Sequence, residues 1–337
     1  MPSARRLIFS AVTLIPGVAS LPPVKRILMN KAKGTGGSIS ASYCYSVWLR
    51  HLVTTAGCGL NCNPRTVAEL GPGDSLGVGL AALLSGAERY YALDVVEHAS
   101  AAHNIAVLDA LVDLFRTRAP IPDDAAFPHV MPRLHNYRFP HHILTPHRLD
   151  RALAPERVER IRASLRDCAS ADSLITYRVP WYGADVIQSE SVDMLFSQAV
   201  LEHVDALRET YSAMYAWLAP NGYFSHTVDF KSHGFADEWD GHWRYSDLFW
   251  KFVRGKSIWS INREPWSTHV GYLRNAGLRL VKQQFSHRPS TLHRAQAARR
   301  YRSVPASDFT ISDATYQAVK QDSDRATPLV RASSAPD

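Results

Sequence analysis

A glycine-rich turn between an apolar strand and a helix is the feature that most constrains how this chain can fold. The run Thr66–Leu70 predicts a strand, Gly71-Pro-Gly-Asp-Ser-Leu-Gly77 follows it, and a helix is expected over 77–85. Glycines let the backbone approach a ligand that larger side chains would block. The start of the helix adds unpaired N–H groups facing the same crevice. The pattern therefore predicts a nucleotide-binding turn.

Short strands and helices alternate along the rest of the chain, which is typical of a parallel sheet covered on both faces. The other expected strands are 89–94, 173–179, 192–199, 223–230, 278–285 and 315–320. The other expected helices are 40–55, 97–118, 148–168, 202–218, 267–276 and 290–302. The pattern predicts an α/β fold with seven strands, most of them parallel, and two insertions, 95–172 and 231–265, on the acceptor side.

The two ends of the chain differ in composition from its body. Residues 1–40 form a basic and apolar arm, 41–320 the folded domain, and 321–337 a polar tail expected to be disordered. In the arm, the apolar run Leu7–Ala19 is broken by Pro16 and is too short to span a bilayer. Lysines and arginines follow it closely, so we expect an arm that packs on the domain or touches a membrane surface.

Charge and cysteine content limit the classes of partner. The formal net charge of +7 over 337 residues suits an acidic partner without selecting one. No basic run interleaved with aromatic residues indicates a nucleic-acid groove. Four cysteines in so long a chain argue against a disulfide framework and fit a reducing compartment.

Four motifs in order resemble those of class I methyltransferases that use S-adenosylmethionine (SAM), over roughly residues 64–285. They are Glu69-Leu-Gly-Pro-Gly73, Leu93-Asp94, the stretch from Ser191 to Val204 that contains Ser-Gln-Ala-Val-Leu-Glu-His-Val, and Trp217-Leu-Ala-Pro-Asn-Gly-Tyr223. The resemblance implies a Rossmann-like fold, SAM as cofactor and methyl transfer as the activity. A cytoplasmic location is then expected, because an exported enzyme would lack its methyl donor.

The resemblance assigns the cofactor contacts to residues at the strand ends. Glu69, Gly71 and Gly73 would hold the methionine part of SAM, and Asp94 its ribose, while Ser197, Gln198 and His203 would lie near the transferred methyl group. The spacing of Asp94, 21 residues after Gly73, independently places a carboxylate at the end of the next strand. Many relatives carry an acid after the third strand. Here Val179-Pro-Trp-Tyr-Gly183 stands there, so we expect adenine to stack on Trp181 or Tyr182.

The acceptor side is predicted from a segment rich in histidine and aspartate. A hydroxyl acceptor must lose a proton, and the candidate bases are His226, Asp229 and His233, with His203 next. Side-chain alternation predicts that His226 and Asp229 face opposite sides of their strand. No compact metal-binding spacing appears, so no metal is expected. The acceptor is unidentified, and a hydroxyl of a glycan, a lipid-linked compound or another small molecule fits the arm.

Two other functions stay open from the sequence. A nicotinamide-dependent oxidoreductase would use a similar sheet and glycine-rich turn. The glycine spacing here, G-x-G-x-x-x-G, differs from the dinucleotide fingerprint by one residue. A methyltransferase-like domain that only binds a ligand is the non-enzymatic alternative.

Overall fold

The computed structural model describes residues 4–22, 24, 37–257 and 260–320. The expected disordered tail, 321–337, lies outside the described residues, as do Lys25, Arg26, Lys31 and Lys33 of the arm.

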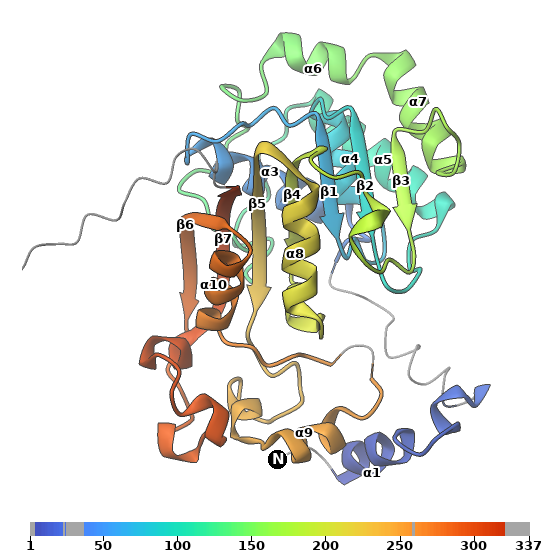
Figure 1. The fold of residues 1–337 in the computed structure, drawn as a ribbon. Helices are drawn as coiled ribbons and strands as arrows, with labels where there is room; N and C mark the ends of the chain where they lie inside the picture. Colours follow the sequence, from blue (N-terminus) through green and yellow to red (C-terminus); the bar gives the residue numbers. More distant parts are fainter. Residues whose placement is uncertain (1–3, 23, 25–36, 258–259, 321–337) are drawn as a thin grey trace, which may run out of the picture.

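Seven strands form one sheet in the order β3-β2-β1-β4-β5-β7-β6 (Figure 1). Their bounds are β1 Thr66–Leu70, β2 Arg89–Leu93, β3 Ile175–Arg178, β4 Val192–Gln198, β5 Leu218–Asp229, β6 Leu278–His287 and β7 Ile311–Lys320. The neighbours from β3 to β5 are parallel, and β7 runs antiparallel to both β5 and β6. The predicted Rossmann-like, mostly parallel α/β fold is confirmed.

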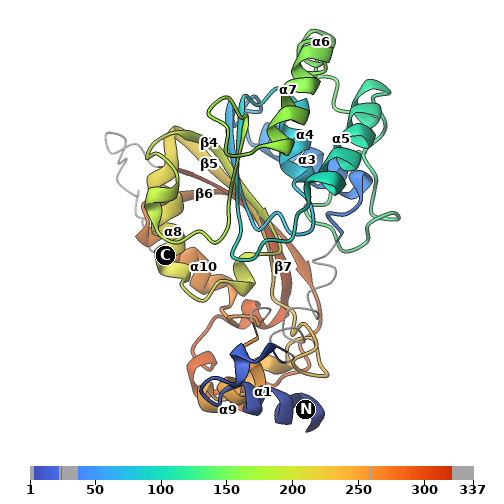
Figure 2. The ribbon, with the colours of Figure 1, turned by 90° about the vertical axis from the view of Figure 1, so that its right-hand side faces the viewer.

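Helices cover both faces of the sheet, with a hydrophobic core under each layer (Figure 2). One layer contains α3 Ala41–Ala56, α4 Gly77–Leu84, α5 Ala101–Arg116, α6 Pro146–Ala152 and α7 Pro155–Arg166. The other contains α8 Leu207–Trp217 and α10 Trp266–Asn275. Trp48 and Tyr90 are buried in the first core, and Trp217 and Tyr316 in the second.

A third group of helices lies beyond the carboxyl ends of the parallel strands. Helix α1, Ala4–Thr13, packs beside α9, Asp247–Arg254, and the backbone N–H of Lys256 donates to Thr13 Oγ1 at 3.0 Å (Figure 1). Short 3-10 turns complete the described chain: η1 Val18–Ser20, η2 Ala184–Val186, η3 Leu201–His203, η4 Gly241–Arg244, η5 Arg294–Gln296, η6 Arg299–Tyr301 and η7 Ala306–Thr310. No helix in the described ranges is long and apolar enough to cross a bilayer.

Several expected elements have different bounds in the structure. The helix expected over 148–168 is two helices, because Pro155 begins a new one. The helix expected from Glu202 begins at Leu207, after a turn that carries Glu202 and His203. Residues 290–302, expected to be helical, form only the two short turns η5 and η6.

The two insertions lie in different places. Helices α5 to α7, within 95–172, pack on the α3–α4 layer, and α6 and α7 lie at the end of the sheet opposite α9 (Figure 1). These helices therefore do not cover the carboxyl edge, contrary to the expectation. Residues 231–257 and 260–265 do lie at that edge, around α9.

Candidate cofactor and acceptor site

The sheet has its topological switch point between β1 and β4. From β1 the chain passes to β2 and β3 on one side, and then returns to β4 on the other side of β1. Ligands of open α/β sheets bind outside the carboxyl ends of the strands at such a point. The glycine-rich turn after β1 and the loop after β4 meet there, so this edge is the candidate site.

The glycine-rich turn requires glycine at its first position. Gly71 has φ of 62° and Gly73 has φ of 73°, values that larger residues rarely adopt. A Cβ on Gly71 would lie 2.6 Å from Cγ2 of Val200, in the loop after β4. The backbone N–H of Gly71 donates to the carbonyl oxygen of Leu93 at 2.8 Å, which ties the turn to the end of β2.

Asp94 faces this turn, as the spacing predicts. Its carboxylate accepts a hydrogen bond from the backbone N–H of Val95 at 2.7 Å, and a longer one from Gly73 at 3.4 Å. Only 8% of the residue is exposed, and this burial raises the pKa of Asp94 above its ordinary value. The backbone bonds fix the carboxylate beside the glycine-rich turn.

Glu69 is buried and already has a partner. Its carboxylate accepts a hydrogen bond from the Tyr90 hydroxyl at 2.5 Å, and burial raises the pKa of Glu69 to about 8. A Cβ on residue 79 would lie 2.0 Å from Cζ of Tyr90, so glycine at 79 makes room for the ring that reaches Glu69. In the described structure Glu69 thus anchors the end of β1, and its contact with SAM stays a prediction.

The other expected cofactor residues divide into those near Asp94 and those turned into the layers. The backbone N–H of Trp181 donates to the carbonyl oxygen of Asp94 at 3.2 Å, and its ring packs edge-on against Trp217. Ser197 is fully buried, with its hydroxyl bonded to His226 Nδ1 at 2.7 Å. The side-chain oxygen of Gln198 lies 3.2 Å from His51 Nε2 of α3. Trp181 therefore lies near the expected ribose, whereas the Ser197 side chain points into the second core.

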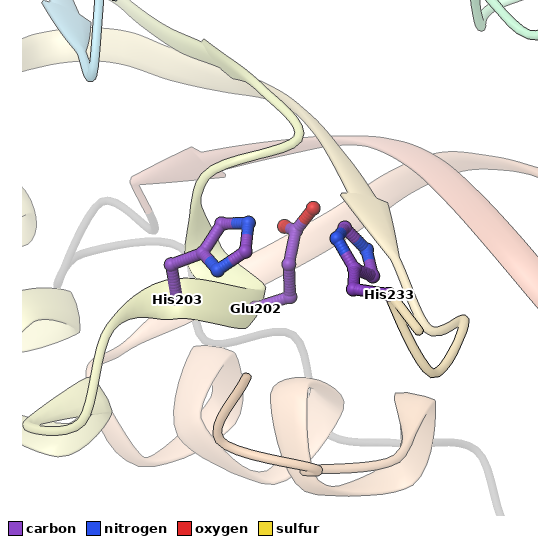
Figure 3. Close-up of side chains that lie close together, drawn as sticks. All are labelled: Glu202, His203 and His233. Atoms are coloured by element: carbon purple, nitrogen blue, oxygen red, sulfur yellow. The ribbon is translucent and has the colours of Figure 1, made fainter. Parts of the chain in front are cut away.

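Four polar residues gather at the carboxyl ends of β4 and β5. Glu202 and His203 lie in the turn η3 after β4, Asp229 ends β5, and His233 follows it. One potential ligand atom from each of Glu202, His203 and His233 lies within 4.8 Å of the others (Figure 3). His233 Nε2 also lies 3.4 Å from Asp229 Oδ2. The structure thus brings together three of the four predicted bases, and adds Glu202, which the sequence analysis did not single out.

The pKa values of these residues are shifted in different directions. Burial, reinforced by the neighbouring His233, lowers the pKa of His203 to about 4. Burial alone would raise the pKa of Asp229, but its contacts with His233 and Lys231 outweigh that effect and lower it to about 2. Burial and the Asp229 carboxylate raise the pKa of Glu202 well above its ordinary value. Asp229 is therefore a weak base, and His203 stays neutral at pH 7.

His226 does not lie with this group, which corrects one expectation. The alternation of β5 turns it away from Asp229, as expected, and its ring is fully buried against Phe224 and Tyr316 in the second core. Burial lowers the pKa of His226 well below its ordinary value. With no exposed surface the ring cannot contact an acceptor, so it serves packing and the bond to Ser197.

The chain resembles solved methyltransferase structures. A SAM-dependent methyltransferase from Mesorhizobium loti matches with a TM-score of 0.39 and 12% identity, over 77% of this chain and 91% of that chain. Phosphoethanolamine N-methyltransferase 2 of Haemonchus contortus, in complex with SAM, matches with a TM-score of 0.40 and 13% identity, over 82% of this chain and 53% of that chain. No family model matches the chain, and no curated protein matches it by sequence. At this level of similarity the fold rests on the chain's own strand order, and SAM as cofactor stays a prediction.

Proposed function

We propose that residues 41–320 form a SAM-dependent methyltransferase. The observation that carries this proposal is the Asp94 carboxylate held against the glycine-rich turn at the switch point of the sheet. Asp94 would accept hydrogen bonds from the ribose hydroxyls, and the turn at Gly71 and Gly73 would lie along the methionine part. Trp181, next to Asp94, would support the adenine.

The acceptor would lie over the loops after β4 and β5. Methyl transfer from a sulfonium is an in-line displacement, so the protein mainly orients donor and acceptor and removes a proton where the acceptor is a hydroxyl. His233 is the best placed base of the described residues, because its side chain is 27% exposed and lies beside the Asp229 carboxylate. Asp229 would stabilise the protonated ring, since its own low pKa makes it a weak base.

An acceptor at a membrane surface fits the helices beside this edge. Helices α1 and α9 expose the apolar side chains of Ile8, Val12, Leu248 and Phe252, and Lys251 lies among them. Apolar side chains flanked by cations are typical of helices that lie in the interface of an anionic membrane. We therefore propose a cytoplasmic enzyme with peripheral membrane contact and a lipid-linked acceptor. Sedimentation with anionic vesicles should pull down the wild type and leave a Leu248→Ser/Phe252→Ser variant in solution.

Transfer of a labelled methyl group tests the activity. Cell extract fractions would be incubated with the full chain and SAM carrying a deuterated methyl group, and products identified by mass spectrometry. We expect a labelled product and release of S-adenosylhomocysteine with the wild type, and less of both with Asp94→Ala at the same concentration of SAM. Binding of SAM without any labelled product in lipid or aqueous fractions would favour the ligand-binding alternative.

A further inference from the structure

The cluster after β4 and β5 has the composition of a metal site. Glu202, His203 and His233 supply one carboxylate and two imidazoles, with ligand atoms within 4.8 Å of one another. Figure 3 shows the Glu202 carboxylate between the two rings. Asp229 Oδ2 lies 3.4 Å from His233 Nε2, longer than a usual hydrogen bond, and offers a fourth donor.

The environment of the Glu202 carboxylate points to a ligand. The residue is 3% exposed, and neither carboxylate oxygen makes a hydrogen bond of normal geometry within the described structure. The backbone N–H groups of Glu202 and Asp229 lie close enough to the carboxylate to affect the pKa of Glu202, but neither forms a hydrogen bond of normal geometry with it. An ionised carboxylate loses its hydration when it is buried, which is strongly unfavourable unless a partner compensates the loss. A cation would supply that compensation.

The surroundings hold the donors in place. His203 Nδ1 lies 3.3 Å from the carbonyl oxygen of Ser260, which can only accept, so Nδ1 carries the hydrogen and Nε2 keeps its lone pair. Such a bond from the second ring nitrogen to a carbonyl is usual for histidines that bind metals. Asn262 donates to the carbonyl oxygens of Leu201 and Val204 at 2.7 and 2.8 Å, which fixes the turn that carries Glu202.

Local charge and backbone geometry agree with this reading. When ionised, Glu202, Asp229 and Asp313 outnumber the cation among them, Lys231, which pairs with both aspartates. Arg263, across a small cavity lined by Glu202 and Asp229, is paired with Asp247. His233 of the cluster and Ala199, directly after β4, have φ of 47° and 54°, strained values that tend to occur at functional sites.

We propose that Glu202, His203 and His233, with Asp229 as fourth donor, bind a divalent transition-metal ion. Two imidazoles with carboxylate oxygens suit Zn²⁺ or a similar ion better than Mg²⁺ or Ca²⁺, which prefer oxygen donors alone. The partly exposed His233 gives the ion a path from solvent. The site would bind its ion without SAM or an acceptor, so the proposal goes beyond the proposed methyl transfer. With the ion bound, His233 would act as a ligand rather than a base, and the ion would lower the pKa of an acceptor oxygen bound to it.

Metal titration of the full, untagged chain tests this inference. After treatment with a chelator, the protein would be titrated with Zn²⁺ by calorimetry, and bound zinc counted by elemental mass spectrometry. We expect one equivalent bound by the wild type. Glu202→Gln and His233→Ala should bind zinc at least about tenfold more weakly. His135→Ala removes an exposed histidine elsewhere and should bind as the wild type does.

Equal zinc affinity in all four proteins would overturn the site, as would a wild-type Kd weaker than about 100 μM. Circular dichroism checks that each variant is folded. If Glu202→Gln does not fold, His233→Ala decides, because its side chain lies at the surface. A parallel SAM titration of the metal-free wild type keeps the two proposals separate. If the wild type binds SAM but not zinc, only the metal site is rejected. If it binds zinc but not SAM, only the cofactor assignment is rejected.

Discussion

Two glutamates are buried at the carboxyl edge of the sheet, and their surroundings differ. Glu69, at the end of β1, accepts a hydrogen bond from Tyr90, whereas Glu202, after β4, accepts none of normal geometry from the described residues. Each is 3% exposed, so burial alone does not distinguish them. On the side of the edge that would hold the cofactor, the buried carboxylate of Glu69 already has a partner within the protein. On the acceptor side, the Glu202 carboxylate has no such partner among the described residues.

The largest expected effect lies on the cofactor side. Gly71→Val should abolish SAM binding, because φ of 62° disfavours a β-branched residue and even a Cβ would lie 2.6 Å from the Val200 side chain. Calorimetric titration measures the loss. Gly271→Ala is the control, since its Cβ position in α10 has no described atom within 4 Å apart from its chain neighbours and the backbone of its own helix. Normal SAM affinity in a folded Gly71→Val protein would mean that the turn does not face the cofactor.

On the acceptor side, His233→Ala should lower the turnover by about 10²-fold, with little change in SAM affinity, whether His233 removes the proton itself or binds the proposed metal ion. His226→Ala offers the contrast. It should leave affinity intact but lower the free energy of unfolding by about 1–3 kcal/mol, because Ser197 loses its buried partner. Steady-state kinetics and urea unfolding separate the two variants. Should His226→Ala lose turnover while keeping its stability, the placement of the base would be wrong.

Asp94→Ala should weaken SAM binding by about 1–3 kcal/mol, since charged hydrogen bonds to the ribose would vanish. Asp94→Asn keeps the size of the side chain and should weaken binding less. Titration of both variants against the wild type gives the order of affinities. Equal affinities for all three would contradict the assignment of the ribose to Asp94.

Tyr90→Phe makes the two glutamates alike. Without the hydroxyl, Glu69 would be buried with its main side-chain partner gone, and the free energy of unfolding should fall by about 1–2 kcal/mol. Urea unfolding of the wild type and the variant measures the difference. An unchanged stability would show that the Tyr90 bond does not distinguish Glu69 from Glu202.

Glu202→Gln should stabilise the metal-free protein, an effect of opposite sign that depends on pH. The pKa of Glu202 is raised in the folded protein, so above the ordinary glutamate pKa, about 4.3, the unfolded chain loses its proton first. Wild-type stability without metal then falls as pH rises, by at most about 1.4 kcal/mol per pH unit from this group. Glutamine lacks this loss, so the variant's advantage should grow from pH 4 to pH 8. A constant difference over that range would show that Glu202 has a normal pKa.

Much of the fold could be predicted because its signals are local. The strand Thr66–Leu70 ends where expected, since a run of apolar residues meets a glycine turn. Pro155 shows the limit: the charged pattern of 148–168 is helical throughout, but proline begins a second helix there. Residues 290–302 carry a helical composition, but they form short turns, and Ser290 and Thr291 are held by the distant carboxylate of Asp240.

The site was predictable on the cofactor side and less so on the acceptor side. Gly71 and Asp94 are joined by a fixed spacing that strand topology converts into proximity. Glu202 and His233 are 31 residues apart, and only the pairing of β4 with β5 brings them together. The position of His203 beside Glu202 in Leu-Glu-His-Val was the available signal. The burial of His226 depends on Tyr316 of β7, which no local pattern relates to it.

Direct titration tests whether the edge of the sheet at the glycine-rich turn binds SAM. The full chain would be titrated by calorimetry with SAM, S-adenosylhomocysteine and NAD under the same conditions. We expect one equivalent of SAM and one of S-adenosylhomocysteine to bind, and no heat from NAD. Binding of NAD without SAM would contradict this expectation and favour an oxidoreductase on the same sheet.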